Sequence, residues 1–211
     1  MFDRKLFWTS FLLMVVAEMC SLFAYTLNAP FLQPVFLGIA LLGTAVISII
    51  NFEYGLLVVF GELFVSSFGH LFQIEYGPIR ISLRIGLFML MNTIYFFKST
   101  FGRSFPFRHS RYFWPSTAFT AVIAMGFIVG GLYKNGWSNI FHDADGYIMF
   151  AYFAPAFAFF RTKESRARLA TVFVAALTWL GLQTALVLFV FAHRMRTPMQ
   201  VLYLWIRDAR I

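Results

Sequence analysis

Charged side chains are scarce in this chain of 211 residues: Asp, Glu, Lys and Arg together make up 12% of it, whereas 60% is apolar. Soluble domains usually contain about 25% charged residues, so this composition excludes an ordinary soluble enzyme. Hydrophilic stretches as long as a small soluble domain, about 50 residues, are also missing from the sequence. We therefore predict one integral membrane domain that covers residues 1–211.

Cysteine is nearly missing as well, because Cys20 is the single one in the sequence. One cysteine excludes a disulfide framework. The sequence also lacks a P-loop, a dinucleotide fingerprint, zinc-ligand spacing and a serine nucleophile elbow, so we expect neither a metal nor a cofactor. The net charge of +8 comes from basic residues in short loops between apolar runs. That distribution is typical of membrane topology signals, and we expect no nucleic-acid partner.

Long apolar runs dominate the rest of the sequence. A helix needs about 20 such residues to cross about 30 Å of hydrocarbon, and most of the runs approach this length. The predicted fold class is all-α, a polytopic transmembrane helical bundle of about seven spans. The runs are Leu6–Leu27, Phe31–Ile50, Tyr54–Phe72, Ile81–Phe97, Phe113–Leu132, Gly146–Phe160 and Leu169–Ala192.

Three basic clusters predict the orientation of these spans. They are Arg4–Lys5, the loop over residues 98–111 and the loop over residues 161–168. If every run crosses, all three clusters fall on one side, which the positive-inside rule makes cytoplasmic. The sixth run is short and contains Pro155, but a re-entrant sixth run would move residues 161–168 outside, against the charge bias. We therefore predict a multi-pass protein with a cytoplasmic N-terminus and Ile211 outside.

Arginines gather on the predicted outer side, where the same rule predicts few. Arg80 and Arg84 are four residues apart at the start of the fourth run, which would place both on one face of a helix. Arg194 and Arg196 follow the seventh run. A planar guanidinium suits phosphate, so all four arginines are candidates for binding an anionic substrate.

Two carboxylates lie near the middle of predicted spans, Glu18 in the first run and Glu62 in the third. An isolated carboxylate at that depth is expected to be protonated or paired. Both would fit a proton relay, although pairing with a neighbour is more common. Arg84 offers such a partner, and a structural ion pair with Glu62 or Glu18 is the alternative to its role in substrate binding.

The motif "HDADGY" precedes the sixth run and contains His142, Asp143 and Asp145. Carboxylates at such a position would fit a metal site or a general base. They are more typical of the N-terminal cap of a helix, where they accept hydrogen bonds from backbone N–H groups. We favour the cap.

Three segments carry a resemblance to a known family: "GELFVSSFGHLFQIEYGPIRISLRIGLFMLMNTIYFF", "DADGYIMFAYFAPAFAFF" and "LYLWIRDARI". Together they resemble the N-terminal part of O-antigen ligase and polymerase-like membrane proteins. The resemblance implies a glycosyltransferase of lipopolysaccharide biosynthesis that acts on a polyprenyl-pyrophosphate-linked glycan at the outer face of the bacterial inner membrane. It also implies that Arg80, Arg84, Arg194 and Arg196 hold the lipid pyrophosphate.

Members of that family continue with more helices and a large periplasmic loop that carries the base for the acceptor hydroxyl. The chain is therefore expected to be the N-terminal half of a larger bundle or a truncated relative, and its catalytic base is unassigned. Two other classes stay open. A transporter or channel would use Glu18, Glu62 and Arg84 as an intramembrane polar path, and a non-catalytic scaffold would place the same charges in structural pairs.

Overall fold

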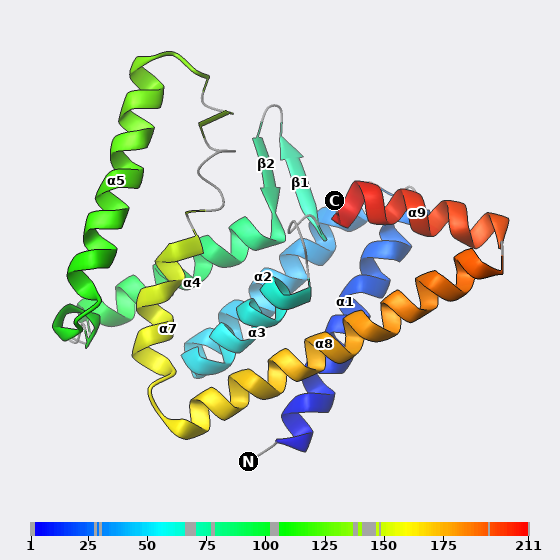
Figure 1. Cartoon of the computed structure of the whole chain (residues 1–211), viewed down its shortest axis with the longest axis horizontal. Coiled ribbons are helices and arrows are strands. Elements are labelled where there is room, and N and C mark those ends of the chain that lie inside the picture. The colour runs from blue at the N-terminus through cyan, green and yellow to red at the C-terminus, as the bar shows by residue number, and fades with distance from the viewer. Residues whose placement is uncertain are drawn as a thin grey trace. The chain divides into compact units, whose positions relative to one another are not determined.

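In the computed structural model, the part of the chain that is described comprises residues 3–27, 29, 31–65, 71–76, 79–101, 106–136, 139–140, 147, 149–193 and 195–210. Within these residues the chain forms eight α-helices, two short 3-10 helices and one two-stranded sheet (Figure 1). The mainly helical architecture that the composition predicts is confirmed.

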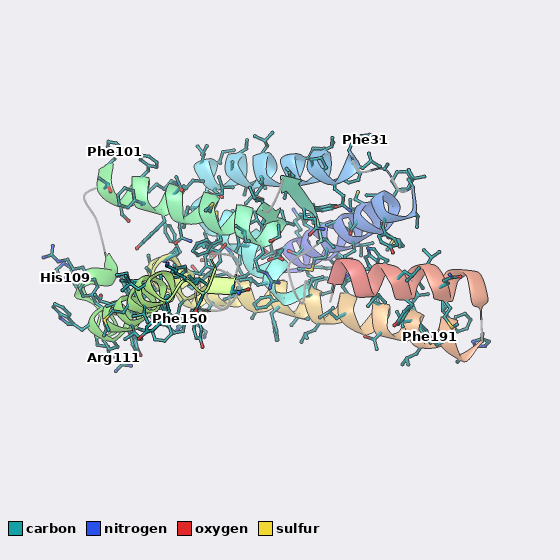
Figure 2. The ribbon with its side chains drawn as sticks, turned by 90° about the horizontal axis from the view of Figure 1, so that it is seen from above. Phe31, Phe101, His109, Arg111, Phe150 and Phe191 are labelled. Atoms are coloured by element: carbon teal, nitrogen blue, oxygen red, sulfur yellow. The ribbon has the colours of Figure 1, made fainter. Side chains whose placement is uncertain are left out.

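Four of the described helices are long and apolar enough to cross a membrane. They are α1 (Arg4–Thr26), α2 (Leu32–Ile50), α5 (Phe113–Leu132) and α8 (Lys163–Ala192). Large apolar side chains project outward from the helices and stay exposed, as Figure 2 shows for Phe31, Phe101 and Phe191. Exposed apolar surface of this extent is unfavourable in water and suits lipid. These properties indicate a multi-pass membrane protein.

The other three predicted spans differ from the helices found. The described part of α3 (Phe52–Val65) has 14 residues, which at 1.5 Å per residue gives about 21 Å of the hydrocarbon thickness of about 30 Å, and residues 66–70, the rest of the predicted span up to the described Leu71, lie outside the described part. α4 (Leu83–Phe101) begins two residues later than expected and ends four residues later. The sixth run contains the 3-10 helix η2 (Met149–Tyr152) and the 7-residue helix α7 (Phe153–Phe159).

A β-hairpin precedes α4, where the sequence predicts the end of one span and the start of the next. Strand β1 (Gln73–Tyr76) pairs antiparallel with β2 (Ile79–Ser82). At the open end of the hairpin, the backbone N–H of Leu83 donates to the carbonyl of Phe72 at 2.9 Å. Ser82 then starts α4, because its Oγ accepts from the backbone N–H of Ile85 at 3.4 Å.

The chain divides into two compact units. The first consists of residues 1–91 and 162–211. In it α8 packs against α1 and α3, α2 packs against α3, and α9 (Arg196–Arg210) contacts α1 and α8. Its core gathers Val65, Ala176 and Trp179. Gly61 allows close packing there, because a Cβ at this position would lie 3.1 Å from Cε of Met14 in α1.

The second unit covers residues 92–161. The 3-10 helix η1 (Pro106–His109) packs against α5 and α7 in this unit. Phe107 makes edge-to-face contacts with Phe113, Phe153 and Phe157, and the centroids of the rings lie 5.6–6.0 Å apart. Aromatic rings therefore hold this unit together, with apolar area and favourable ring geometry as the stabilising terms.

Two segments outside the predicted spans are helical in the structure. The basic residues 163–168 form the first turns of α8, which Thr162 caps by accepting a hydrogen bond from the N–H of Ser165 at 3.0 Å. The segment after the seventh run contains α9, which packs against α8 and α1 within the first unit. The chain therefore continues beyond its last long helix with a further helix.

Candidate functional site

Arg84 and Glu62 form an ion pair between α4 and α3. The Nε of Arg84 lies 3.4 Å from each carboxylate oxygen of Glu62, and the two side chains are 15% and 7% exposed. The separation is longer than the 2.7–2.9 Å or so of a strong charge-assisted hydrogen bond. The structural ion pair between Arg84 and Glu62, which was the alternative to substrate binding, is therefore present. Its distance makes it an interaction of moderate strength.

Arg80 is not on the helix that carries Arg84. It lies in β2, where its backbone is opposite Glu75 of β1. The prediction that Arg80 and Arg84 share a helical face is wrong. Arg80 lies in a β-strand, where successive side chains point to opposite faces, so the four-residue spacing of a helix does not apply to it. The side chain of Arg80 lies outside the described part of the structure.

The other arginine candidates are not placed in detail. Arg194 lies outside the described residues, and Arg196 is the first residue of α9, with a side chain that also lies outside them. His142, Asp143 and Asp145 fall outside as well, so their role as a helix cap stays a prediction. Of the four arginines predicted to bind pyrophosphate, Arg84 is thus the one whose surroundings are defined, and the binding role itself stays a prediction.

Glu18 is the second carboxylate that the sequence places inside the membrane, and it is 1% exposed in α1. The side-chain amide of Gln183 in α8 donates a hydrogen bond to Oε2 of Glu18. Two buried polar side chains thereby join two long apolar helices, which is how helices in membranes gain specific contacts. Gln183 is not among the residues predicted above, although a lone amide inside an apolar run is a usable signal.

Ser21 makes another polar contact nearly one turn farther along α1. Its hydroxyl donates to the carbonyl of Leu71 at 2.9 Å and accepts from the indole Nε1 of Trp205 at 3.2 Å. Trp205 belongs to α9 and is 1% exposed. Three distant parts of the chain therefore meet at one buried hydroxyl, and neither Ser21 nor Trp205 was a candidate from the sequence.

Arg168 forms a third polar contact, between the first turns of α8 and α3. Its Nη1 lies 3.2 Å from Oε1 of Glu53, and its Nη2 lies 2.5 Å from Oε1 of Glu164 on the same helix. The guanidinium carbon is 5.8 Å from the ring centroid of Tyr54, within reach of a cation–π interaction. This contact joins α8 to α3, whereas the contact at Ser21 joins α1 to α9 and to Leu71.

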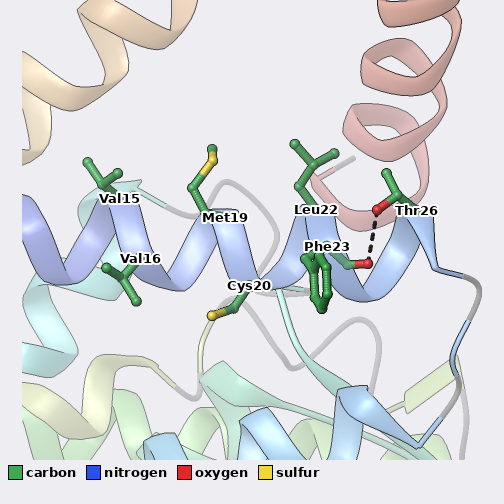
Figure 3. Close-up of a pocket in the computed structure, with 7 residues that line it drawn as sticks. All are labelled: Val15, Val16, Met19, Cys20, Leu22, Phe23 and Thr26. Atoms are coloured by element: carbon green, nitrogen blue, oxygen red, sulfur yellow. Dashed lines mark hydrogen bonds between the residues drawn. The ribbon is translucent and has the colours of Figure 1, made fainter.

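An apolar groove follows α1. Its lining residues, drawn in Figure 3, are Val15, Val16, Met19, Cys20, Leu22, Phe23 and Thr26. The one hydroxyl among them, on Thr26, donates to the carbonyl of Phe23 at 3.0 Å. The groove offers mainly apolar surface, which suits lipid chains.

In the described part of the first unit, the polar contacts join helices to one another, and Arg84 lies next to the carboxylate of Glu62. Comparison with protein families, with curated proteins and with solved structures found no match to this chain. No family is therefore shown, and the function has to be argued from the residues themselves.

Proposed function

We propose that this chain is a multi-pass membrane protein that binds a polyprenyl-pyrophosphate-linked glycan at the outer face of the inner membrane, as O-antigen ligase and polymerase-like glycosyltransferases do. The observation that carries the proposal is the placement of Arg84. A carboxylate beside Nε restrains the orientation of the guanidinium, and a restrained guanidinium binds phosphate with less loss of side-chain entropy. The resemblance in sequence supplies the identity of the ligand.

The proposed topology has seven membrane crossings, a cytoplasmic N-terminus and the hairpin and α9 outside. Contacts within the first unit support it. Ser21 near the C-terminal end of α1 meets Leu71, which follows α3, and Trp205, which follows α8. Arg168 at the start of α8 meets Glu53 at the start of α3. These contacts are compatible with α1, α3 and α8 running in the same direction, as the alternation of spans requires.

The described part of α3 covers less than the hydrocarbon thickness, and the proposal has to accommodate this. A helix of about 21 Å reaches both interfaces when the bilayer thins locally or when flanking polar residues extend toward water. Glu53 and Arg168, which lie at the start of α3 and α8, are suited to the second arrangement. The proposal therefore counts α3 as a crossing in which charged residues mark the inner boundary.

A non-catalytic membrane scaffold is the second candidate, and the same ion pair favours it. Arg84 and Glu62 are mostly buried, and a pair of this kind is often purely structural. In a scaffold, Arg84 would join α4 to α3 and would have no ligand. The two candidates therefore differ in one measurable property, the affinity of the protein for a lipid pyrophosphate.

The test measures binding of polyprenyl pyrophosphate to the purified chain in nanodiscs, with the uncharged polyprenol as the reference ligand. The proposal expects tighter binding of the pyrophosphate. It also expects a loss of about tenfold or more in Arg84→Ala, since a hydrogen bond to a charged group contributes about 1.5–3 kcal/mol. Arg84→Lys should lose nearly as much, because lysine keeps the charge but not the planar fork.

Controls separate loss of binding from loss of fold. Arg111→Ala removes an exposed arginine on the opposite predicted side and should bind as the wild type does. Every variant is compared at matched abundance of folded protein, at a temperature below its own melting transition. Equal binding of both lipids by the wild type, or full binding by the Arg80→Ala/Arg84→Ala double variant, would reject the proposal in favour of the scaffold.

A further inference from the structure

α9 does not continue the axis of α8 but turns back from its end (Figure 1). It starts at Arg196, four residues after α8 ends at Ala192, and it contacts both α8 and α1. Figure 1 shows it crossing the C-terminal part of α1. α8 is long enough to span a membrane, and if it does, the turn between α8 and α9 lies near a membrane surface.

Trp205 fixes the depth of α9. The indole is buried and donates to Ser21, which lies five residues before the last residue of α1, Thr26. At 1.5 Å per residue, this contact is about 7–8 Å inside the end of the helix. Amphipathic helices at membrane surfaces sit about 5–10 Å into the boundary between headgroups and acyl chains. If the last turn of α1 marks the membrane boundary, this contact places Trp205 at the depth of such a helix.

The two sides of α9 differ in chemistry. Trp205 is buried, whereas Gln200 and Tyr203 are exposed, Tyr203 by 55%. Helical spacing places backbone positions 196, 207 and 210 on the side of Gln200 and Tyr203. All three positions are arginine, and α9 contains one acidic residue, Asp208. The helix therefore has one side packed on the bundle and one side where basic positions accompany a tyrosine.

We propose that α9 lies in the headgroup layer of the membrane and that its exposed side binds anionic phospholipid. Tyrosine and arginine are enriched at this level, where an apolar stem and a polar tip are both accommodated. Basic side chains near an anionic surface are attracted electrostatically, and the attraction is lost in a neutral bilayer. The inference does not depend on glycan binding, because phospholipid alone is the ligand.

The experiment measures the depth of one position on α9 in the full-length chain. A nitroxide spin label is attached to Tyr203→Cys in a Cys20→Ser background, and the protein is placed in nanodiscs of phosphatidylcholine with or without phosphatidylglycerol. Collision with oxygen and with a neutral, water-soluble nickel chelate reports depth. Leu42→Cys, 70% exposed in α2, is the hydrocarbon reference, and Asn135→Cys, in the exposed turn after α5, is the water reference.

We expect the label at position 203 to lie at a depth between the two references. We also expect its accessibility to the nickel chelate to fall when phosphatidylglycerol is present. Arg207→Gln/Arg210→Gln should lose that shift while the fold is retained. A label as accessible to nickel as Asn135→Cys in both lipids would overturn the proposal, as would one as deep as Leu42→Cys. An intermediate depth that is the same in both lipids would overturn the assignment of anionic phospholipid as the partner.

Discussion

Ser48 in α2 and Gly55 in α3 lie so close together that a Cβ atom on Gly55 would be 1.9 Å from Oγ of Ser48 and 2.8 Å from its Cβ. The chain turns between them at Asn51, whose Oδ1 accepts a hydrogen bond from the N–H of Glu53 at 3.0 Å. The hydroxyl of Ser48 donates to the carbonyl of Thr44 at 2.6 Å. The tight connection of α2 to α3 therefore requires a residue without a side chain at position 55.

Gly55→Ala should destabilise the protein by about 1–3 kcal/mol, the usual cost of overpacking a closely packed contact. A rotation of Ser48 relieves the clash with its hydroxyl but not the clash with its Cβ. The measurement is the free energy of unfolding in a detergent titration. The matched control is Gly43→Ala in α2, where an added Cβ meets nothing within 4 Å. Gly43→Ala should be neutral or slightly stabilising, because alanine favours a helix.

A compensating variant makes this prediction stricter. Ser48→Gly/Gly55→Ala moves the small residue to the other side of the same contact, so part of the lost stability should return. Stability in Gly55→Ala equal to that of the wild type would show that the two helices separate more easily than the close approach suggests.

Trp205 and Ser21 should be energetically coupled, since their hydrogen bond joins residues 184 positions apart. Trp205→Phe keeps an aromatic ring and removes the donor, and Ser21→Ala removes the acceptor. In a double-mutant cycle the coupling should be about 1 kcal/mol, the typical net contribution of one hydrogen bond. Tyr203→Phe, on the exposed side of α9, is the control and should leave stability unchanged. A coupling of zero would mean that α9 is not docked on α1 in solution.

The long helices could be predicted from the sequence, and the hairpin could not. In α1, α2, α5 and α8, length and apolar composition suffice, because a helix satisfies its backbone within itself. The hairpin between Gln73 and Ser82 depends on a ladder between two strands. Each strand alone is a short mixed segment with apolar neighbours, so the apolar pattern predicts a helix that already includes Ile81 and Ser82.

The partner of Arg84 could be predicted, whereas the partners of Glu18 and Ser21 could not. A deep arginine requires a nearby acceptor, and the candidates in the sequence were two glutamates, of which Glu62 is the partner found. Glu18 meets Gln183 across 165 positions, and Ser21 meets Trp205. Contacts of that separation follow from how the helices pack, which the periodicity of one helix does not specify.

Removing Arg84 should be more damaging than removing the whole ion pair. Arg84→Met takes away the cation beside the buried carboxylate of Glu62, and breaking a buried pair on one side costs on the order of 3 kcal/mol. Glu62→Gln/Arg84→Met leaves no charge there and should be closer to the wild type. The measurement is the melting temperature of each variant in one detergent. If both variants melt at the wild-type temperature, the pair contributes nothing to the stability of the first unit.

Reporter fusions should place the ends of α1 and α9 on the same side of the membrane. Ser21 meets Leu71 and Trp205, so the C-terminal part of α1, the start of the hairpin segment and α9 belong to one end of the first unit. Arg168 and Glu53 join the starts of α8 and α3. We therefore expect fusions after Leu27 and after Ile211 to report the outside, and a fusion after Arg161 to report the cytoplasm, with alkaline phosphatase and a fluorescent protein as the paired reporters. The basic residues 161–168 favour the same result.

Two outcomes would contradict this arrangement. If the fusions after Leu27 and Ile211 report opposite sides, α9 is not docked on α1. If the fusions after Arg161 and Ile211 report the same side, α8 does not cross the membrane.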